Sequence, residues 1–262
     1  MNYKQGAYNG IGRHLLKLTD NGYLDRFKLP TGYPLQPYVY MLGQRGRKYF
    51  EEELNWDIPK LPTLATMKTR SHSFLMHVLE GNNVIIAAKQ FATYNPNASL
   101  IRFEHEVLLK KNPLLAISLT GKKIAISPDA LLEIEANGRR VLWIEVERGT
   151  NNEKYLLEKM HDIYDVFDRR VFQDRVGTNR CRVCFMTTAG YTDVERLRRL
   201  ARTVLTERLG TAAPQSKRNL IFNFIDIPAM ETGEIDVART FLQSSWLHPF
   251  HLEHFPILEV KE

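Results

Sequence analysis

Apolar residues near the start of the chain recur with the period of a helix. Ile11, Leu15 and Leu18 are spaced by four and three positions, and Gly22 follows where a helix C-cap is expected. This pattern predicts a helix that ends just before Gly22 and carries one apolar stripe.

Two strands and a second helix are predicted next. The runs YLDRF (23–27) and YVYML (38–42) have the composition of strands, and residues 43–54 return to a helical pattern. A helix followed by a two-stranded wing is typical of the second half of a winged helix-turn-helix, so residues 1–56 are predicted to form a winged-helix DNA-binding domain. Such a domain normally has two helices before its recognition helix. We therefore expect this one to be incomplete at its N-terminus, abbreviated or completed by a partner.

The rest of the chain is predicted to form a linker and a larger domain of class α/β. The chain as a whole is then of class α+β. Residues 57–68 contain two prolines and are predicted to be the linker. Strands that alternate with helices after a meander indicate a mixed sheet over residues 69–262. The predicted elements are one or two helices in 70–92, strands at 114–119 and 123–127, a hairpin of 130–135 and 141–147, a helix at 151–172, a strand at 181–188, a helix at 193–209, a strand at 219–226 and an irregular tail around 244–250.

The predicted hairpin contains more acidic residues than a buried hairpin needs. Asp129 precedes its first strand, and Glu145 and Glu147 lie on its second strand, where alternation places them on one face. A divalent cation needs such oxygen ligands, and Mg²⁺ takes one or two carboxylates together with water and phosphate. Glu133 and Glu135 have the same parity as Asp129, however. The pattern therefore fits either a metal site or a polar face of an ordinary hairpin.

The distribution of charge favours a polyanionic partner. The net charge is +6, and residues 169–218 alone carry 12 basic and 4 acidic side chains. Residues 69–168, which contain the acidic hairpin, are close to neutral. Two polar stripes fit DNA contact or, alternatively, an ordinary solvated surface: Asn9, Arg13 and Lys17 on the first helix, and Arg196, Arg198, Arg199 and Arg202 on the helix at 193–209.

Several other classes of protein are excluded or not indicated by the sequence. A hydrophobic fraction of 44% is ample for a packed core, and no apolar run is long enough for a membrane span or a secretion signal, so a cytoplasmic protein is expected. Cys181 and Cys184 are three positions apart in a predicted strand. They should therefore point to opposite faces, which suits packing better than zinc binding. No phosphate-binding glycine motif is present.

Six segments together resemble the replication-relaxation family of plasmids and integrative elements. They are LLKLTDNGYLDR (15–26), YVYMLGQRGRKYF (38–50), HVLEGNNV (77–84), FEHEVL (103–108), PDALLEI (128–134) and EVERGT (145–150). The resemblance spans most of residues 10–250. Within it, the order of PDALLEIE and IEVERGT resembles the PD-(D/E)XK core of restriction-endonuclease-like proteins, and implies that fold for the larger domain.

The resemblance also implies roles for individual residues. Asp129 and Glu145 match the metal-binding pair, and Glu106 matches an upstream acid that often joins the site. Glu147 stands where the superfamily has its lysine, so Lys159 or Lys154 on the following helix, or the adjacent Arg148, is the candidate for that role. His77 lies in the family-like helical segment and is interpreted as a structural hydrogen-bonding residue.

The implied function is that of a DNA-binding protein of a mobile element. Its larger domain is either a nickase or nuclease that uses Mg²⁺ or Mn²⁺, with Asp129, Glu145, Glu147 and Lys159 as catalytic residues, or a degenerate site that only binds double-stranded DNA. Two alternatives remain open. One is a winged-helix transcriptional regulator whose larger domain dimerises or senses a ligand, and the other is an assembly factor that recruits replication or mobilisation proteins. A homodimer is compatible with each.

Overall fold

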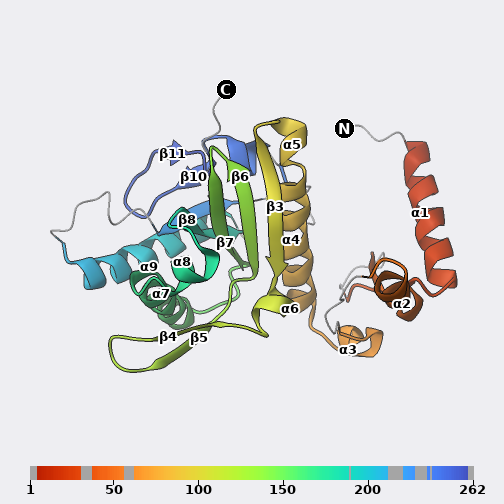
Figure 1. Cartoon of the computed structure of the whole chain (residues 1–262), viewed down its shortest axis with the longest axis horizontal. Coiled ribbons are helices and arrows are strands. Elements are labelled where there is room, and N and C mark those ends of the chain that lie inside the picture. The colour runs from red at the N-terminus through yellow and green to blue at the C-terminus, as the bar shows by residue number, and fades with distance from the viewer. Residues whose placement is uncertain are drawn as a thin grey trace. The chain divides into compact units, whose positions relative to one another are not determined.

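The structure is a computed structural model that describes residues 5–30, 37–55, 62–188, 190–211, 221–227, 235–236 and 238–258 (Figure 1). The chain divides into two compact units, Met1–Met76 and His77–Glu262. Residues 57–61 of the predicted linker and residues 219–220 of a predicted strand lie outside the described residues.

The first unit contains the predicted helix, strand pair and second helix. In it β1 pairs antiparallel with β2, and α2 starts immediately after β2. A Cβ atom on Gly46 would lie 2.2 Å from the carbonyl oxygen of Tyr23, so this close approach of α2 to the chain before β1 requires glycine. The elements are α1 (Gln5–Asp20), β1 (Leu24–Lys28), β2 (Tyr38–Leu42), α2 (Gln44–Glu52), α3 (Leu64–Lys68) and the first turn of α4 (His72–Lys89).

The apolar stripe of α1 is largely solvent-exposed. Ile11 and Leu18 have exposed fractions of 55% and 42%. The helix itself was predicted correctly, but Ile11 and Leu18 of its apolar stripe are not buried. The segment predicted as linker contains α3, whose N-cap Thr63 accepts a hydrogen bond from the amide of Thr66.

The second unit is built on a mixed sheet with the order β11-β10-β9-β8-β7-β6-β3. Strands β3, β6 and β7 form an antiparallel meander, and β7, β8 and β9 are parallel, with α7 and α9 as crossovers. The elements are α4, α5 (Phe91–Tyr94), β3 (Ala98–His105), α6 (Glu106–Leu109), β4 (Leu114–Ile117), β5 (Lys123–Ile126), β6 (Ala130–Ala136), β7 (Arg139–Glu147), α7 (Glu153–Asp168), α8 (Val171–Val176), β8 (Cys181–Thr187), α9 (Tyr191–Leu209), β9 (Phe222–Asp226), the π-helix η1 (Ala238–Leu242), β10 (Trp246–Leu247) and β11 (His254–Phe255). The predicted mixed α/β architecture is confirmed.

Both faces of the sheet are covered, which gives the unit two hydrophobic cores. On one face Trp143 packs among the buried side chains of α7, α8 and α9. On the other face Ile144 packs with α4, α5 and the segment from η1 to residue 258. Cys181 belongs to the first core and Cys184 to the second, as their spacing predicted. Because the sheet is buried on both faces, an acid on β6 or β7 can reach solvent only near a strand end.

Three sequence-based assignments were wrong or too simple. Residues 98–105, for which no strand was predicted, form strand β3. The tail called irregular supplies β10, and its Trp246 is completely buried. The helix predicted over 151–172 is interrupted at Arg170, whose φ of 64° is left-handed, and α8 follows it. Among the described helices, none has the length and apolar character that crossing a membrane requires.

Candidate metal centre

Asp129 is held by the backbone at the start of β6. Its amide donates to the carbonyl oxygen of Ile144 over 3.0 Å, and its Oδ2 accepts from the amide of Val146 over 2.9 Å. Burial by itself would raise the pKa of Asp129. The hydrogen bond from His77, the charge of Lys159 and the Val146 amide outweigh burial and lower this pKa to about 2. Asp129 is therefore a fixed carboxylate at neutral pH.

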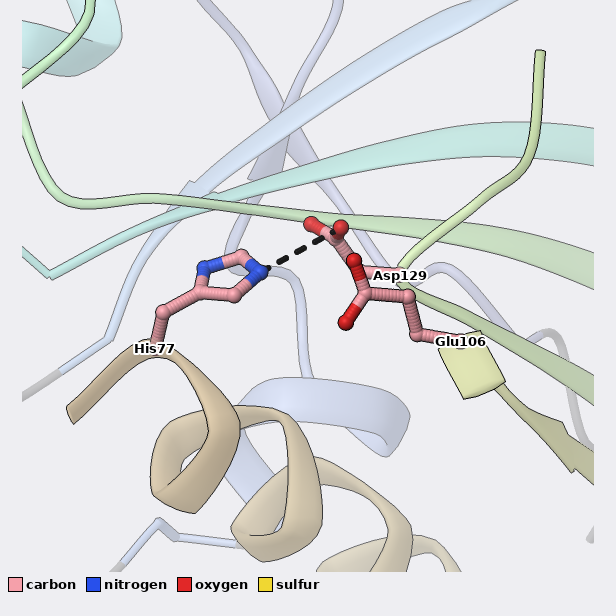
Figure 2. A group of neighbouring side chains, drawn as sticks. All are labelled: His77, Glu106 and Asp129. Carbon is pink, nitrogen blue, oxygen red and sulfur yellow. Dashed lines mark ion pairs between the residues drawn. The ribbon is translucent and has the colours of Figure 1, made fainter. Parts of the chain in front are cut away.

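Glu106 and His77 meet Asp129 from two other elements (Figure 2). Glu106 is the first residue of α6, and its amide donates to the carbonyl oxygen of Asp129 over 3.0 Å. His77 lies on α4 with its Nε2 3.3 Å from Asp129 Oδ1. One potential ligand atom from each of the three residues lies within 4.8 Å of the others. The hydrogen bond to Asp129 raises the pKa of His77, because the neighbouring carboxylate stabilises the protonated imidazole.

The donor set of this group fits a divalent cation. Two carboxylates suit Mg²⁺, Ca²⁺ or Mn²⁺, whereas an imidazole is a better ligand for transition metals. Their combination fits Mn²⁺ better than Mg²⁺. Three protein ligands would leave coordination positions for water or a phosphate oxygen, as catalytic metal sites require.

A second charged group, formed by residues of β7 and α7, lies next to the first. Glu145 is completely buried, and its Oε1 accepts from Trp143 Nε1 over 2.6 Å. Its Oε2 is 2.6 Å from Lys159 Nζ, which is also 3.5 Å from Glu147 Oε1. The other oxygen of Glu147 accepts from Asn151 Nδ2 over 2.7 Å. One ammonium group is thus clamped between two buried carboxylates of the same strand.

The pKa values of Glu145 and Lys159 are both raised, the first by burial and the second by neighbouring carboxylates. Burial raises the pKa of Glu145, opposed by Lys159 and reinforced by the charge of Asp129. Burial would lower the pKa of Lys159, but the charges of Glu145, Asp129 and Glu147 outweigh it, so this pKa is raised. Lys159 therefore keeps its proton at neutral pH.

Members of both groups line one cleft of about 470 Å³. Glu106, Asp129 and Lys159 all line it, so a bound phosphate could reach the cation ligands and the ammonium group together. The remaining lining residues are Lys110, Pro113, Ala125, Ile126, Ser127, Tyr155, Glu158 and Asp162.

The register of the hairpin explains why these residues meet. Ala130 pairs with Ile144, which places Asp129 opposite Glu145 at the same end of the strands. Asn137 and Gly138 make the turn with left-handed φ values of 52° and 96°. Lys159 reaches the pair because Leu156 and Met160 are buried against this face and place it at the border of the buried stripe of α7.

The structure separates the sequence-predicted site residues into different roles. Asp129 and Glu106 join the candidate metal group, whereas Glu145 and Glu147 hold Lys159. Lys159 is the lysine that reaches the acids, while Lys154 is exposed. Arg148 is not at the cleft, because it forms an ion pair with the buried carboxylate of Glu80.

His77 is the member of the candidate metal group that the sequence analysis did not include. It was interpreted as structural, because no spacing motif links it to Asp129, 52 positions away. The only available signal was its place in one of the six family-like segments. The polar hairpin face is also excluded as an explanation, because buried Leu131 and Trp143 lie between Asp129 and Glu133 on that face. Glu133 instead pairs with Arg139 and Arg102 at the far end.

The predicted DNA-contacting arginines of α9 mostly bind the protein itself. Arg198 is completely buried and donates to the carbonyl oxygens of His248 and His251, so its predicted phosphate contact is wrong. Arg202 donates to the carbonyl oxygen of Pro249 over 2.9 Å. Arg196 is 3.5 Å from Asp193, and Arg199 pairs with Glu153 but remains 57% exposed.

On α1, Arg13 and Lys17 are exposed, as contact with a partner requires. Asn9 lies in the same helix, with its side chain outside the described part of the chain.

The family comparison covers the whole of this centre. A family model described as Replication-relaxation matches residues 5–180, which is about two-thirds of the chain. The chain belongs to the replication-relaxation family. The matched region includes α1, the wing-like strands, all three members of the candidate metal group and Lys159. Membership of this family indicates a protein associated with plasmid replication and a DNA-related function. Comparison with curated proteins and with solved structures gave no match.

Proposed function

We propose that this replication-relaxation protein binds DNA and cleaves phosphodiester bonds in it with the help of a divalent cation. The observation that carries the proposal is the convergence of His77, Glu106 and Asp129 beside a cleft that Glu106, Asp129 and Lys159 line. A carboxylate-rich cation site beside a buried ammonium group is what phosphoryl chemistry needs, because negative charge develops on the phosphate oxygens. We also propose that plasmid replication or mobilisation proteins are its protein partners.

The proposed domain organisation assigns binding and cleavage to different parts of the chain. Residues 1–56 are proposed to form a winged-helix domain, with Arg13 and Lys17 on its DNA-facing helix, followed by a linker over residues 57–68. Residues 69–262 are proposed to form an endonuclease-like domain of the PD-(D/E)XK type. The order of Asp129, Glu145 and Glu147 on two adjacent antiparallel strands supports this assignment.

Each residue of the cleft has a separate task in the proposed reaction. A cation bound there would polarise a phosphoryl oxygen and lower the pKa of a bound water. Asp129 is pre-ionised and fixed by the Val146 amide, so it can hold the cation without rearrangement. Glu106 contributes a second oxygen and His77 a nitrogen.

Lys159 takes the place of the lysine that the PD-(D/E)XK pattern has two positions after Glu145. It comes from α7 rather than from β7, and Glu145 and Glu147 position its ammonium group. There it can stabilise charge on the phosphate or orient the attacking water. Glu147 is thereby a positioning residue, because its contacts are with Lys159 and Asn151.

Nicking of supercoiled plasmid tests the proposal. Full-length protein with Mn²⁺ should convert supercoiled to open-circular DNA, and Asp129→Ala should abolish the conversion. Glu133→Gln is the matched control, because Glu133 lies on the same face of the same hairpin but belongs to an ion-pair group at its far end. Nicking that persists in Asp129→Ala would remove the cleft from consideration. Binding without nicking would leave a DNA-binding relic of the endonuclease fold.

A further inference from the structure

The β4–β5 hairpin forms a sheet of its own and projects from the seven-stranded sheet (Figure 1). One face of it is buried, with Leu114 and Ile124 packed into the core beneath α7. Because side chains alternate along a strand, the other face points to solvent. Leu115 and Ile117 on that face have exposed fractions of 66% and 54%, and Leu119 in the turn that follows β4 is 66% exposed. Three large apolar side chains in a row on a protruding hairpin are typical of a contact surface.

The charge of this segment restricts what it can contact. Between Val107 and Pro128 the sequence has four lysines and no acidic residue. Lys110 pairs with Glu106 and Lys122 with Asp162, which leaves Lys111 and Lys123 exposed and without an ion pair among the described residues. The exposed Arg169 donates to the carbonyl oxygen of Ser118 over 3.4 Å and adds another cation near the hairpin end.

The base of the hairpin is a wall of the candidate metal cleft. Pro113, Ala125 and Ile126 line the same 470 Å³ space as Glu106 and Asp129. A polymer that lies along the hairpin would therefore pass over the cation ligands. A small ligand in the cleft would not need the apolar residues at the hairpin's outer face.

We propose that the β4–β5 hairpin is a DNA-binding element of the cleavage site, an inference that rests on the proposed function. Lys111 and Lys123 neutralise backbone phosphates, and the exposed apolar side chains of Leu115, Ile117 and Leu119 enter the minor groove. Leucine and isoleucine side chains inserted there unstack a base step and bend the duplex. The bend presents a strained phosphodiester to the cleft.

The same surface suits a second copy of the chain poorly. In a twofold-symmetric dimer a patch contacts itself, so the lysines of one hairpin would face those of the other. Like charges that approach in an interface destabilise it. A polyanion removes this repulsion, which is why DNA is the favoured occupant.

Site-specific labelling tests the proposal on the full chain. Both natural cysteines are buried, so a surface cysteine can be labelled selectively. Ile117→Cys and Ile86→Cys form a matched pair, because both isoleucines are 54% exposed and Ile86 lies on α4. An environment-sensitive fluorophore at position 117 should respond to a 20-base-pair duplex in EDTA, whereas the same fluorophore at position 86 should not.

Two further measurements separate the charged from the apolar interaction. Lys111→Ala/Lys123→Ala should reduce the slope of log affinity against log salt by about 1.8, roughly 0.9 for each phosphate that is no longer neutralised. Lys89→Ala, an exposed lysine on α4, should leave the slope unchanged. Leu115→Ser/Ile117→Ser/Leu119→Ser should keep the slope but abolish duplex bending measured by energy transfer between end labels.

The outcomes distinguish this proposal from the proposed function. Duplex binding with a silent label at position 117 and an unchanged slope overturns the hairpin proposal alone. A response at position 117 without Mn²⁺-dependent nicking supports the hairpin and removes the nuclease. Failure of the full chain to bind duplex at low salt overturns both. A label that responds to protein concentration rather than to duplex identifies an interface between copies, and also overturns the proposal.

Discussion

Lys159 is balanced by carboxylates that come from a single strand, and this arrangement has a cost. Glu145 is completely buried and the side chain of Lys159 is only 15% exposed, so each needs the other to compensate for the hydration that burial removes. Stability alone does not explain why this ion pair is present, because apolar residues of similar size often stabilise a protein equally well. The pair does place an ammonium group at a fixed position beside Asp129.

Removal of Lys159 should affect stability and cleavage differently. Lys159→Met leaves the buried carboxylate of Glu145 without its partner and should destabilise the protein by about 3–5 kcal/mol. Adding Glu145→Gln removes that charge, so the double variant should recover most of this stability in urea denaturation yet remain unable to nick plasmid. Recovery of nicking in the double variant would exclude Lys159 from the chemistry.

Direct titration with Mn²⁺ should identify which acid belongs to the cation site. His77→Ala and Glu106→Gln should each weaken Mn²⁺ binding at least tenfold, and Asp129→Ala should abolish it, since these residues form the spatial group. Glu145→Gln should bind Mn²⁺ within a few-fold of the natural protein, because Glu145 holds Lys159 instead. The opposite ranking would return Glu145 to the metal site that the sequence resemblance implies.

Among the elements, helix α9 uses its arginines mainly to hold the C-terminal segment and not to present a basic surface. Arg198 and Arg202 donate to backbone carbonyl oxygens of the segment that connects β10 to β11 at one edge of the sheet. Arg198 satisfies two carbonyl groups from a completely buried position. Such a helix holds the C-terminal strands in place, and these complete the sheet beyond β9.

Loss of Arg198 should therefore unfold the C-terminal part of the sheet more readily. Arg198→Met leaves the carbonyl groups of His248 and His251 without a donor and should cost about 2–6 kcal/mol, at about 1–3 kcal/mol for each unsatisfied buried group. The neighbouring exposed Arg199→Met should change stability by less than about 0.5 kcal/mol. Urea denaturation of both variants checks the difference, and equal effects would contradict the buried role of Arg198.

At the scale of the whole molecule, the candidate chemistry lies within one unit. Both hydrophobic cores and all three members of the metal group belong to residues 77–262. The first unit carries the exposed basic helix α1 and the strand pair. Truncation can therefore test the proposed winged helix apart from the candidate metal group.

A fragment of residues 69–262 should fold cooperatively and bind Mn²⁺ with the affinity of the full chain. It retains every proposed ligand and both cores, so neither property depends on the first unit. Its affinity for duplex DNA should fall at least tenfold, because the proposed winged helix is missing. Calorimetric unfolding, Mn²⁺ titration and DNA binding measure the three properties. A fragment that fails to fold would contradict the proposed division of the chain.

The sequence by itself determined the local features of this protein. Period-two and period-3.6 patterns located most strands and helices, and the parity of Trp143, Glu145 and Glu147 placed them on one face, because these properties depend on neighbours within a few positions. The family was also recognisable from short segments in order. Strand β3 and the strand of Trp246 were missed, since both are stabilised by pairing with distant strands rather than by a local pattern.

Only the tertiary structure decided which charges meet. His77, Glu106 and Asp129 come from three elements, and Lys159 reaches Glu145 only because α7 crosses the face of β7. The exposure of Arg13 and the burial of Arg198 were equally invisible to the pattern, because an arginine on a helix reads the same in either environment. Electrostatic interactions act through space over a few ångströms, so their partners are fixed by the packing of elements and not by spacing along the chain.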